Sequence, residues 1–424
     1  MKKAFDVVVA GAGPAGIAAA VTAAAQHRRV ALVDDNQRPG GQIWRSGASL
    51  PRPARVWLSR LEASAVEHLS GTRIFDHPAP GVLCAEWNET AMELHYEKLV
   101  FATGARELFL PFPGWTLPNV MGAGGLDAMV RGGLPVAGKR VVVAGTGPLL
   151  LAVAAHLAAR GAKIVAICEQ APFARLAKFA AQMSRYPGKL LQGLAYRLAA
   201  RHSRLYCGCW PISASGSTAL ESLTLRQGNR TWSVACDYLA CGFHLVPNLE
   251  LAELLGCRIQ DGFVAVDDLQ QTSVANVYCA GEPTGIGGVE MALVEGQIAG
   301  LAASGSAEAA RKLIPQRRRM LGFVDALRRT CALNPELRRP AADTTLVCRC
   351  EDVPFGTLRE HTSWRDAKLH TRCGMGPCQG RICGAAAEFL FGWGPDAVRP
   401  PIFPALVSSL AAESTNPNKS MEDA

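Results

Sequence analysis

The five cysteines crowded between residues 348 and 383 are the residues whose types and spacing point most directly to chemistry. Cys348 and Cys350 form a C-x-C pair, and Cys378 and Cys383 form a C-x4-C pair that begins 28 residues after Cys350. Four thiolates in two close pairs can bind one zinc ion or a [2Fe–2S] cluster. Because C-x-C with C-x4-C fits the usual pairing of zinc ligands poorly, we favour the cluster, and zinc or an empty site are the alternatives.

The charges around these cysteines also favour the cluster. Four thiolates on two irons leave a net negative charge, and four cations flank the ligands in the sequence: Arg349, Lys368, Arg372 and Arg381. Cys383 opens the alanine-rich stretch 384–391, a predicted helix whose N-terminus favours a thiolate. Cys373 is a fifth candidate, which either replaces one of the four ligands or lies beside them.

A glycine-rich loop near the N-terminus is the second chemically informative stretch. The apolar run that ends at Ala10 predicts a buried strand, the loop opens an alanine-rich helix, and residues 30–33 predict a second buried strand. This βαβ pattern is typical of a dinucleotide-binding site, in which the loop faces the pyrophosphate at a helix N-terminus. The loop residues are Gly11, Ala12, Gly13, Pro14, Ala15 and Gly16.

An acidic residue completes this pattern. Asp34 ends the second strand, 23 positions after Gly11, where a carboxylate can accept hydrogen bonds from both ribose hydroxyls. Asp35 follows it and belongs to the predicted site. A glycine-rich turn of any doubly wound sheet is the alternative, but strand, helix and acidic residue are all in register here. The sequence therefore predicts a nucleotide site.

A second βαβ pattern covers residues 139–169 and lacks the third glycine. Gly145 and Gly147 are in place, Leu150 occupies the third position, and Glu169 ends the following strand. Leu150 would hold the helix further from the strand than glycine does, which disfavours nucleotide binding. Two interpretations of this unit stay open, an NAD(H) site or a fold kept for packing or assembly.

Three further segments resemble the FAD-contacting segments of flavoproteins that carry two dinucleotide-binding domains. They are Gly41-Gln42, Thr103-Gly104 and Gly281-Glu282. The resemblance implies that the first of them runs along the flavin side of FAD and that Glu282 meets the ribityl chain or the pyrophosphate. It also implies a discontinuous FAD-binding domain with the second βαβ unit inserted.

The predicted fold is α/β, with two nested doubly wound dinucleotide-binding domains like those of disulfide-reductase-like flavoproteins and a small C-terminal ferredoxin-like [2Fe–2S] domain. The predicted boundaries are 1–110 and 267–314 for the FAD-binding domain, 111–266 for the inserted domain, 315–343 for a basic helix and linker, 344–407 for the cluster domain and 408–424 for a disordered tail. The basic face of the helix, with Arg317–Arg319, is either solvated or a docking surface for a partner chain.

With these motifs in view, the chain resembles the alpha subunits of heteromeric amino-acid and opine dehydrogenases. That group includes opine oxidases, D-hydroxyproline dehydrogenase, dye-linked proline dehydrogenase, hydrogen cyanide synthase and heterotetrameric sarcosine oxidase. The resemblance covers nearly the whole chain and rests on GAGPAG, RPGGQIWR, ATGAR, PGWTLPNVMGAGG, AGEPTGIGG, CRCEDV and TRCGMGPCQGR. The last two motifs resemble the domain named after bacterioferritin-associated ferredoxin, whose usual second cysteine pair is C-x2-C rather than C-x4-C.

The resemblance implies that a separate beta subunit with its own FAD oxidises the substrate, a secondary-amine amino acid such as an opine, D-hydroxyproline or proline. This chain would then pass electrons through FAD and the cluster to an external acceptor, and no catalytic residue is assigned to it. Some relatives hold an FMN between the subunits, and one branch holds ATP in place of FAD; both arrangements stay open here. Two other functions also stay open, a self-contained NADH-dependent reductase and a non-catalytic binding module.

Composition excludes several other classes. A chain that is 49% hydrophobic and 19% charged is typical of a globular α/β protein rather than a disordered one. The basic residues are scattered apart from Arg317–Arg319, so nucleic-acid binding is not expected. The charge-poor stretches 7–25 and 141–159 contain Gly-x-Gly turns, so no membrane span is predicted. Asp6 and the glycine loop argue against a signal peptide, and the nine dispersed cysteines indicate reduced thiols in a cytoplasmic protein.

Overall fold

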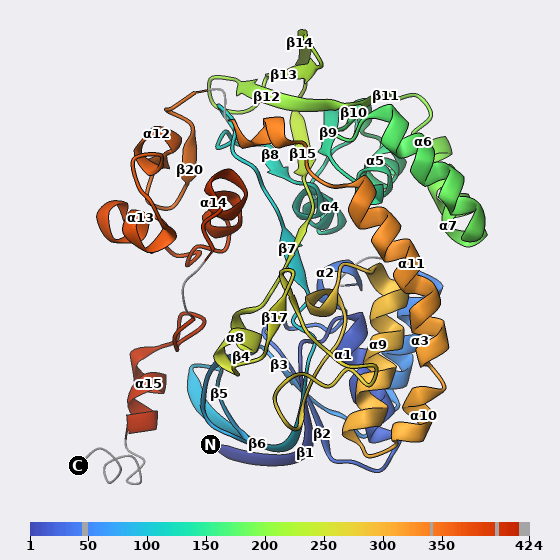
Figure 1. The fold of residues 1–424 in the computed structure, drawn as a ribbon, viewed down its shortest axis with the longest axis vertical. Helices are drawn as coiled ribbons and strands as arrows, with labels where there is room; N and C mark the ends of the chain where they lie inside the picture. Colours follow the sequence, from blue (N-terminus) through green and yellow to red (C-terminus); the bar gives the residue numbers. More distant parts are fainter. Residues whose placement is uncertain (45–49, 340–341, 395–397, 415–424) are drawn as a thin grey trace. The chain divides into compact units, whose positions relative to one another are not determined.

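The computed structural model describes residues 1–44, 50–339, 342–394 and 398–414, which divide into two units (Figure 1). The first unit comprises residues 1–105, 247–321 and the described part of 397–424. The second comprises residues 106–246 and the described part of 322–396. The chain passes from one unit to the other within β7 (Ala105–Glu107), β16 (Leu245–Pro247) and α11 (Ile314–Thr330).

A seven-stranded sheet forms the centre of the first unit, with the order β3-β2-β1-β6-β5-β4 and with β19 paired to β6. The strands β3, β2, β1, β6 and β19 run parallel, whereas β4 and β5 extend the sheet in antiparallel pairs. The strand bounds are β1 (Lys2–Ala10), β2 (Val30–Asp34), β3 (Glu67–Ser70), β4 (Thr72–Ala79), β5 (Val82–Trp87), β6 (Thr90–Phe101), β17 (Ile259–Gln260), β18 (Phe263–Val264) and β19 (Val277–Cys279).

Two helices, α1 and α9, pack against each other and share one core with the sheet. Gly296 of α9 lies directly against α1, since a Cβ at this position would be 2.1 Å from the backbone oxygen of Ala15. Only glycine permits this approach, which holds the start of α1 in place. The helix bounds are α1 (Pro14–Ala24), α2 (Gly41–Trp44), α3 (Arg52–Glu62), α8 (Glu250–Leu254), η2 (Glu282–Thr284), α9 (Gly288–Ala303), α10 (Ala307–Arg311) and α15 (Val407–Ser414).

Residues 247–266 pack onto the other face of this sheet, which moves a predicted boundary. Leu251, Leu255 and Val264 are buried in one core with Phe5 and Leu94. The inserted domain was predicted to extend to 266, but 247–266 belong to the first unit because these side chains complete its core.

The chain returns to the first unit after the second one. Ile402 is buried in the same core, and the Glu86 carboxylate accepts hydrogen bonds from the Leu406 amide (2.9 Å) and the Ser409 hydroxyl (2.8 Å). These contacts anchor α15, so residues 408–414 are helical where the sequence predicts a disordered tail. Residues 415–424 lie outside the described part of the chain.

The second unit repeats the βαβ architecture. Its five-stranded sheet is entirely parallel, with the order β11-β10-β9-β15-β8, and a three-stranded antiparallel sheet has the order β12-β13-β14. The elements are β8 (Val120–Gly122), α4 (Ala123–Arg131), β9 (Arg140–Gly145), α5 (Pro148–Ala159), β10 (Lys163–Glu169), α6 (Phe173–Gln182), η1 (Met183–Arg185), α7 (Pro187–Ala199), β11 (Arg204–Cys207), β12 (Cys209–Ser215), β13 (Ser222–Gln227), β14 (Arg230–Ala235), β15 (Tyr238–Gly242) and η3 (Pro335–Arg338).

A small C-terminal domain belongs to this unit and has its own core, built on Val347, Leu358 and Trp364 and on three of the cysteines. Its elements are β20 (Leu346–Cys348), β21 (Val353–Pro354), α12 (Phe355–Leu358), α13 (Trp364–Thr371) and α14 (Cys383–Phe391). The predicted α/β class with two nested dinucleotide-binding folds is confirmed. Within the described ranges, none of the helices combines the length and apolarity that crossing a bilayer requires.

Candidate functional site

The first glycine loop is held by two close backbone contacts. Gly11 has φ +104°, and a Cβ there would be 2.4 Å from the oxygen of Ala102. A Cβ on Gly16 would be 1.7 Å from the oxygen of Gly11. At Gly13, by contrast, the nearest atom to such a Cβ is the Cα of Gly41, 4.0 Å away. The loop is therefore fixed at Gly11 and Gly16 and less crowded at Gly13, where a phosphate would approach the backbone.

Asp34 is tied to this loop. Its buried carboxylate accepts hydrogen bonds from the Ala12 amide at 2.5 Å and from the Asn36 amide at 2.8 Å. The neighbouring Asp35 lies at the surface, 4.0 Å from the Arg73 guanidinium. Since a carboxylate offers about four acceptor positions, Asp34 can shape the loop and still accept a hydrogen bond from a ribose hydroxyl.

The three predicted FAD segments lie around this loop. The Gly40 amide donates to the Ala12 oxygen at 2.7 Å, and Gly41 begins α2 with φ +58°. Thr103 donates its hydroxyl proton to the Asn248 oxygen at 2.8 Å, and the Asn248 side chain donates to the Thr103 oxygen at 2.8 Å.

The third segment contacts α1 directly. A Cβ on Gly281 would lie 2.9 Å from the Cβ of Ala15. Gln42 and Gly104 follow Gly41 and Thr103 immediately, so every residue of the predicted nucleotide site belongs to this loop and its neighbours in the first unit.

Glu282 carries an unpaired buried oxygen. Its Oε1 atom accepts a hydrogen bond from the Gly288 amide at 2.9 Å, whereas Oε2 is buried with no partner among the described residues. Burial raises the pKa of Glu282 to about 7. A ligand hydroxyl at this position would satisfy Oε2, so the residues present fit a flavin dinucleotide whose ribityl chain lies here.

A buried ion pair supports this third segment. Glu295 is 2% exposed, and its Oε2 atom accepts hydrogen bonds from the Gly281 amide (3.0 Å) and the Thr284 hydroxyl (2.9 Å). Its Oε1 atom accepts from the Arg317 guanidinium at 2.9 Å. Arg317 therefore lies in the interior of the first unit, although the sequence places it on a basic face that is either solvated or free for docking.

The second glycine loop is arranged in the same way but is covered. Glu169 is buried and accepts hydrogen bonds from the Thr146 hydroxyl (2.6 Å), the Gly147 amide (2.6 Å) and the Ala171 amide (2.8 Å). Burial raises the pKa of Glu169. Leu150, which replaces the third glycine, is buried in the core of this unit.

Residues 331–334, hereafter the strap, lie over this loop. The Cys331 sulfur is 3.4 Å from the position that a Cβ on Gly147 would take. Gln170 holds the strap, since its side chain donates to the Ala332 oxygen at 3.3 Å and accepts from the Asn334 amide at 2.9 Å. Arg175 adds a second hydrogen bond to the Ala332 oxygen, at 2.8 Å. The Cys331 side chain thus lies against Gly147, where a pyrophosphate would approach the loop.

Three cysteines of the C-terminal domain converge, and this group includes Cys373 but not Cys350 or Cys378, two of the four predicted ligands. The sulfurs of Cys348, Cys373 and Cys383 lie within 4.8 Å of one another and are buried. Hydrogen bonds from the Cys373 and Cys383 thiols hold the pKa of Cys348 far below its usual range. The Cys350 thiol is exposed and within hydrogen-bonding reach of Cys378. Cys373 thus belongs to the group of converging thiols and is near Cys348 and Cys383 in space.

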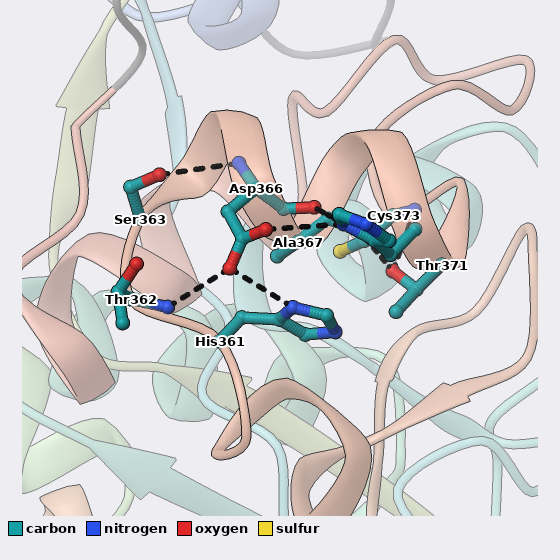
Figure 2. A network of polar contacts seen from close by, with 8 residues as sticks. His361, Thr362, Ser363, Asp366, Ala367, Thr371 and Cys373 are labelled. Atoms are coloured by element: carbon teal, nitrogen blue, oxygen red, sulfur yellow. Dashed lines mark hydrogen bonds and ion pairs between the residues drawn. The ribbon is translucent and has the colours of Figure 1, made fainter.

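Figure 2 shows the contacts that place Cys373. Ser363 caps α13 by accepting from the Asp366 amide at 3.1 Å, and the Asp366 carboxylate contacts the ring nitrogens of His361 (3.1 Å) and His370 (3.0 Å). After the helix ends, the Cys373 amide donates to the Thr371 hydroxyl at 3.2 Å. The Ser363-x-x-Asp366 spacing is a helix-start pattern that could have predicted α13.

A pocket of about 350 Å³ lies beside the cysteines within the second unit. The four predicted ligands, Cys348, Cys350, Cys378 and Cys383, all line it. Its opposite lining includes Phe109 and Trp115, whose rings lie 5.0 Å apart.

The predicted cations around the cysteines are partly engaged elsewhere. Arg372 forms an ion pair with Glu351 at 2.9 Å, and the Arg381 guanidinium contacts the Cys378 oxygen at 3.5 Å. The Arg381 oxygen in turn accepts from Arg106 at 3.0 Å. These residues therefore fix the loops that carry the cysteines as well as adding positive charge near them.

Comparison with known proteins gives the family. Residues 5–297 match the family described as pyridine nucleotide-disulphide oxidoreductase. The chain belongs to this family. It is 32% identical to the A subunit of opine oxidase from Agrobacterium tumefaciens, over 90% of this chain and 84% of the relative. It is 30% identical to the HcnB subunit of hydrogen cyanide synthase from Pseudomonas protegens, over 89% of this chain and 90% of the relative. The crystal structure of L-proline dehydrogenase from P. horikoshii shares the fold, with a TM-score of 0.70 at 18% identity over 96% of this chain and 80% of that one.

The predicted resemblance to opine oxidase and hydrogen cyanide synthase subunits is thus confirmed. In this pyridine nucleotide-disulphide oxidoreductase, the sequence did not identify the residues whose contacts join distant parts of the chain. Glu295, Arg317 and Asn248 support the first nucleotide loop, and Gln170 and Cys331 cover the second. No local pattern marks them, because each contact joins elements far apart in the sequence.

Proposed function

We propose that this oxidoreductase is the electron-transferring subunit of a heteromeric flavoprotein complex. Its partner subunit, which carries its own FAD, would oxidise a secondary-amine amino acid such as an opine, D-hydroxyproline or proline. The observation that carries the proposal is the gathering of five cysteines in one small domain, four of them lining a pocket, in a chain that also has a flavoprotein-type nucleotide fold.

The first nucleotide loop would hold FAD. The less crowded backbone at Gly13 and the unpaired Oε2 atom of Glu282 support this assignment. The residues proposed to contact FAD are Gly11, Ala12, Gly13, Pro14, Ala15, Gly16, Asp34, Asp35, Gly41, Gln42, Thr103, Gly104, Gly281 and Glu282. When bound, FAD accepts an electron pair, and a [2Fe–2S] cluster carries one electron at a time.

The proposed ligands of the cluster are Cys348, Cys350, Cys378 and Cys383. Their shared lining of one pocket supports this set, whereas the closeness of Cys373 to Cys348 and Cys383 supports an exchange of one ligand. In either case β20 ends at Cys348 and α14 begins at Cys383, and an external electron acceptor would reach the cysteines through the pocket that four of them line.

The partner subunit is proposed from the names of the relatives. The opine oxidase and hydrogen cyanide synthase relatives are both named as subunits, and thus as parts of larger enzymes. An FMN at the interface between subunits belongs to the same proposal. The dispersed cysteines of the sequence, read as reduced thiols, are the basis for also proposing a cytoplasmic location.

A self-contained NADH-dependent reductase is the competing function. It requires a dinucleotide at the second glycine loop, where the strap and the Cys331 sulfur lie. This arrangement favours a fold kept for assembly over a working NAD(H) site.

Co-expression with the product of the neighbouring gene, as the candidate partner subunit, tests the proposal. Dye-linked oxidation of opines, D-hydroxyproline and proline should require both chains, and this chain alone should be inactive. Full activity of this chain without its partner would overturn the proposal, and so would a complex that is inactive on every secondary amine tested.

A further inference from the structure

The outer side of helix α7 exposes a row of leucines. Leu191, Leu194 and Leu198 lie at positions i, i+3 and i+7, which places them on one face, and they are 67%, 52% and 65% exposed. Phe173, at the start of α6, is 72% exposed. Soluble monomers rarely leave large apolar side chains grouped in this way without an interaction to cover them.

The inner sides of the same helices are already engaged. The Phe179 ring of α6 lies 6.2 Å from the Phe323 ring, and Tyr186, just before α7, lies 5.7 Å from it. α7 also packs on α5. These contacts hold both helices on the second unit, so the exposed leucines are not needed to fix the helices in place.

The charge of this region is unusually one-sided. Between Glu169 and Glu221 the chain has seven basic residues and no acidic one, in a protein whose total net charge is +8. The basic residues are Arg175, Lys178, Arg185, Lys189, Arg197, Arg201 and Arg204. Four of them, Lys178, Arg185, Arg201 and Arg204, are exposed, whereas Arg175 binds the Ala332 oxygen and Lys189 lies over the Phe323 ring. The exposed side of this region therefore carries positive charge, and a complementary surface would carry carboxylates around an apolar centre.

The positive charge of this surface favours some binding partners over others. A second copy of the chain would bring the same positive surface against itself, and like charges facing each other disfavour an interface. An anionic membrane or an acidic protein would complement it. The curated relatives are named as subunits of larger enzymes, which favours a protein.

We propose that the outer face of α6 and α7 is the docking surface for the catalytic subunit. Leu191, Leu194, Leu198 and Phe173 would enter an apolar area on that subunit, and the surrounding cations would face its carboxylates. The inference rests on the proposed function, since it assigns a place on this chain to the partner that the function requires.

The test compares two sets of exposed leucines in the co-expressed complex. The triple variant Leu191→Gln, Leu194→Gln, Leu198→Gln keeps good helix-forming residues while removing the apolar row. Leu369→Gln is the control, because Leu369 is 63% exposed on α13. In a titration of purified subunits, the triple variant should bind the catalytic subunit roughly 100-fold more weakly, and the control should bind like the wild type. Equal flavin content and circular dichroism spectra establish that both variants are folded.

A charge variant provides an independent check. Lys178→Glu with Arg185→Glu should slow association and weaken its dependence on salt, because both side chains are exposed on the proposed surface.

The outcomes separate the two proposals. If the wild-type chain does not bind the catalytic subunit, the proposed function fails. If the wild-type chain and the triple variant bind it equally well, the docking surface is wrong while the function stands. Flotation with phosphatidylglycerol–phosphatidylcholine vesicles that the triple variant loses, with the complex unaffected, would show that the surface meets a membrane and would also overturn the inference.

Discussion

Replacing Arg317 should destabilise the first unit far more than replacing its neighbour Arg318. Arg317 is 11% exposed and pairs with Glu295, which is 2% exposed, whereas Arg318 pairs with Asp268 at the surface, where the two side chains are 64% and 50% exposed. Removing one partner of a buried pair leaves an uncompensated charge and costs about 3–5 kcal/mol. Removing one partner of an exposed pair costs about 0–1 kcal/mol.

The assay is thermal unfolding of Arg317→Met and Arg318→Met, followed by circular dichroism and by flavin release. For a unit of roughly 200 residues, the buried-pair loss corresponds to a fall in Tm of about 6–20 °C. The surface variant should shift the Tm by no more than about 4 °C. Methionine keeps the aliphatic length of the side chain, so the comparison reports mainly on the charge.

The pH dependence of the Arg317→Met effect gives a second readout. Burial raises the pKa of Glu295 above the ordinary value of 4.5, and the Arg317 charge opposes this rise. Without Arg317, Glu295 should keep its proton in the folded state above pH 4.5, where the unfolded state releases it. The destabilisation caused by Arg317→Met should therefore grow as the pH rises and shrink as the pH falls. Equal effects of the two variants, or a loss that grows toward acid pH, would refute the reasoning.

Three further predictions concern the two nucleotide loops and the cysteines. Because burial raises the pKa of Glu282 from 4.5 to about 7, the flavin-free protein should lose stability as the pH rises through that window, and Glu282→Gln should reduce this loss in urea unfolding at about pH 5 and about pH 8. If the four proposed cysteines bind the cluster, Cys373→Ser should keep its iron and Cys350→Ser should lose most of it by elemental analysis; the reverse result would place Cys373 in the ligand set. Millimolar NADH added without oxygen should leave the flavin absorbance unchanged, because the strap covers Gly147, and bleaching would contradict that.

The features that could be predicted from the sequence are those that depend on residues close together in the chain. The bend at Gly11, the close packing at Gly16 and the acidic residue at Asp34 follow from a strand, a loop and a helix that are consecutive in the chain. The gathering of cysteines in the C-terminal domain could also be predicted, because five of them lie within one short stretch of the sequence.

The features that could not be predicted from the sequence depend on packing between distant segments. Arg317 and Arg318 have the same neighbours in the sequence. Arg317 is buried because it pairs with Glu295 on another helix, whereas Arg318 stays exposed. Cys331 is one of nine dispersed cysteines in the sequence, but the fold places its sulfur against Gly147. Residues 408–414 lack a strong apolar pattern, and Glu86, far away in the sequence, anchors the start of their helix.

The central claim is that the C-terminal cysteines hold a redox-active cluster, and the most direct test is electron paramagnetic resonance of the dithionite-reduced chain with iron and sulfide analysis. Protein prepared without oxygen from iron-replete cells should be coloured, contain two irons and two acid-labile sulfides per chain, and give a signal from one unpaired electron after reduction. A preparation that is colourless, holds zinc in place of iron or stays silent after reduction would contradict the account.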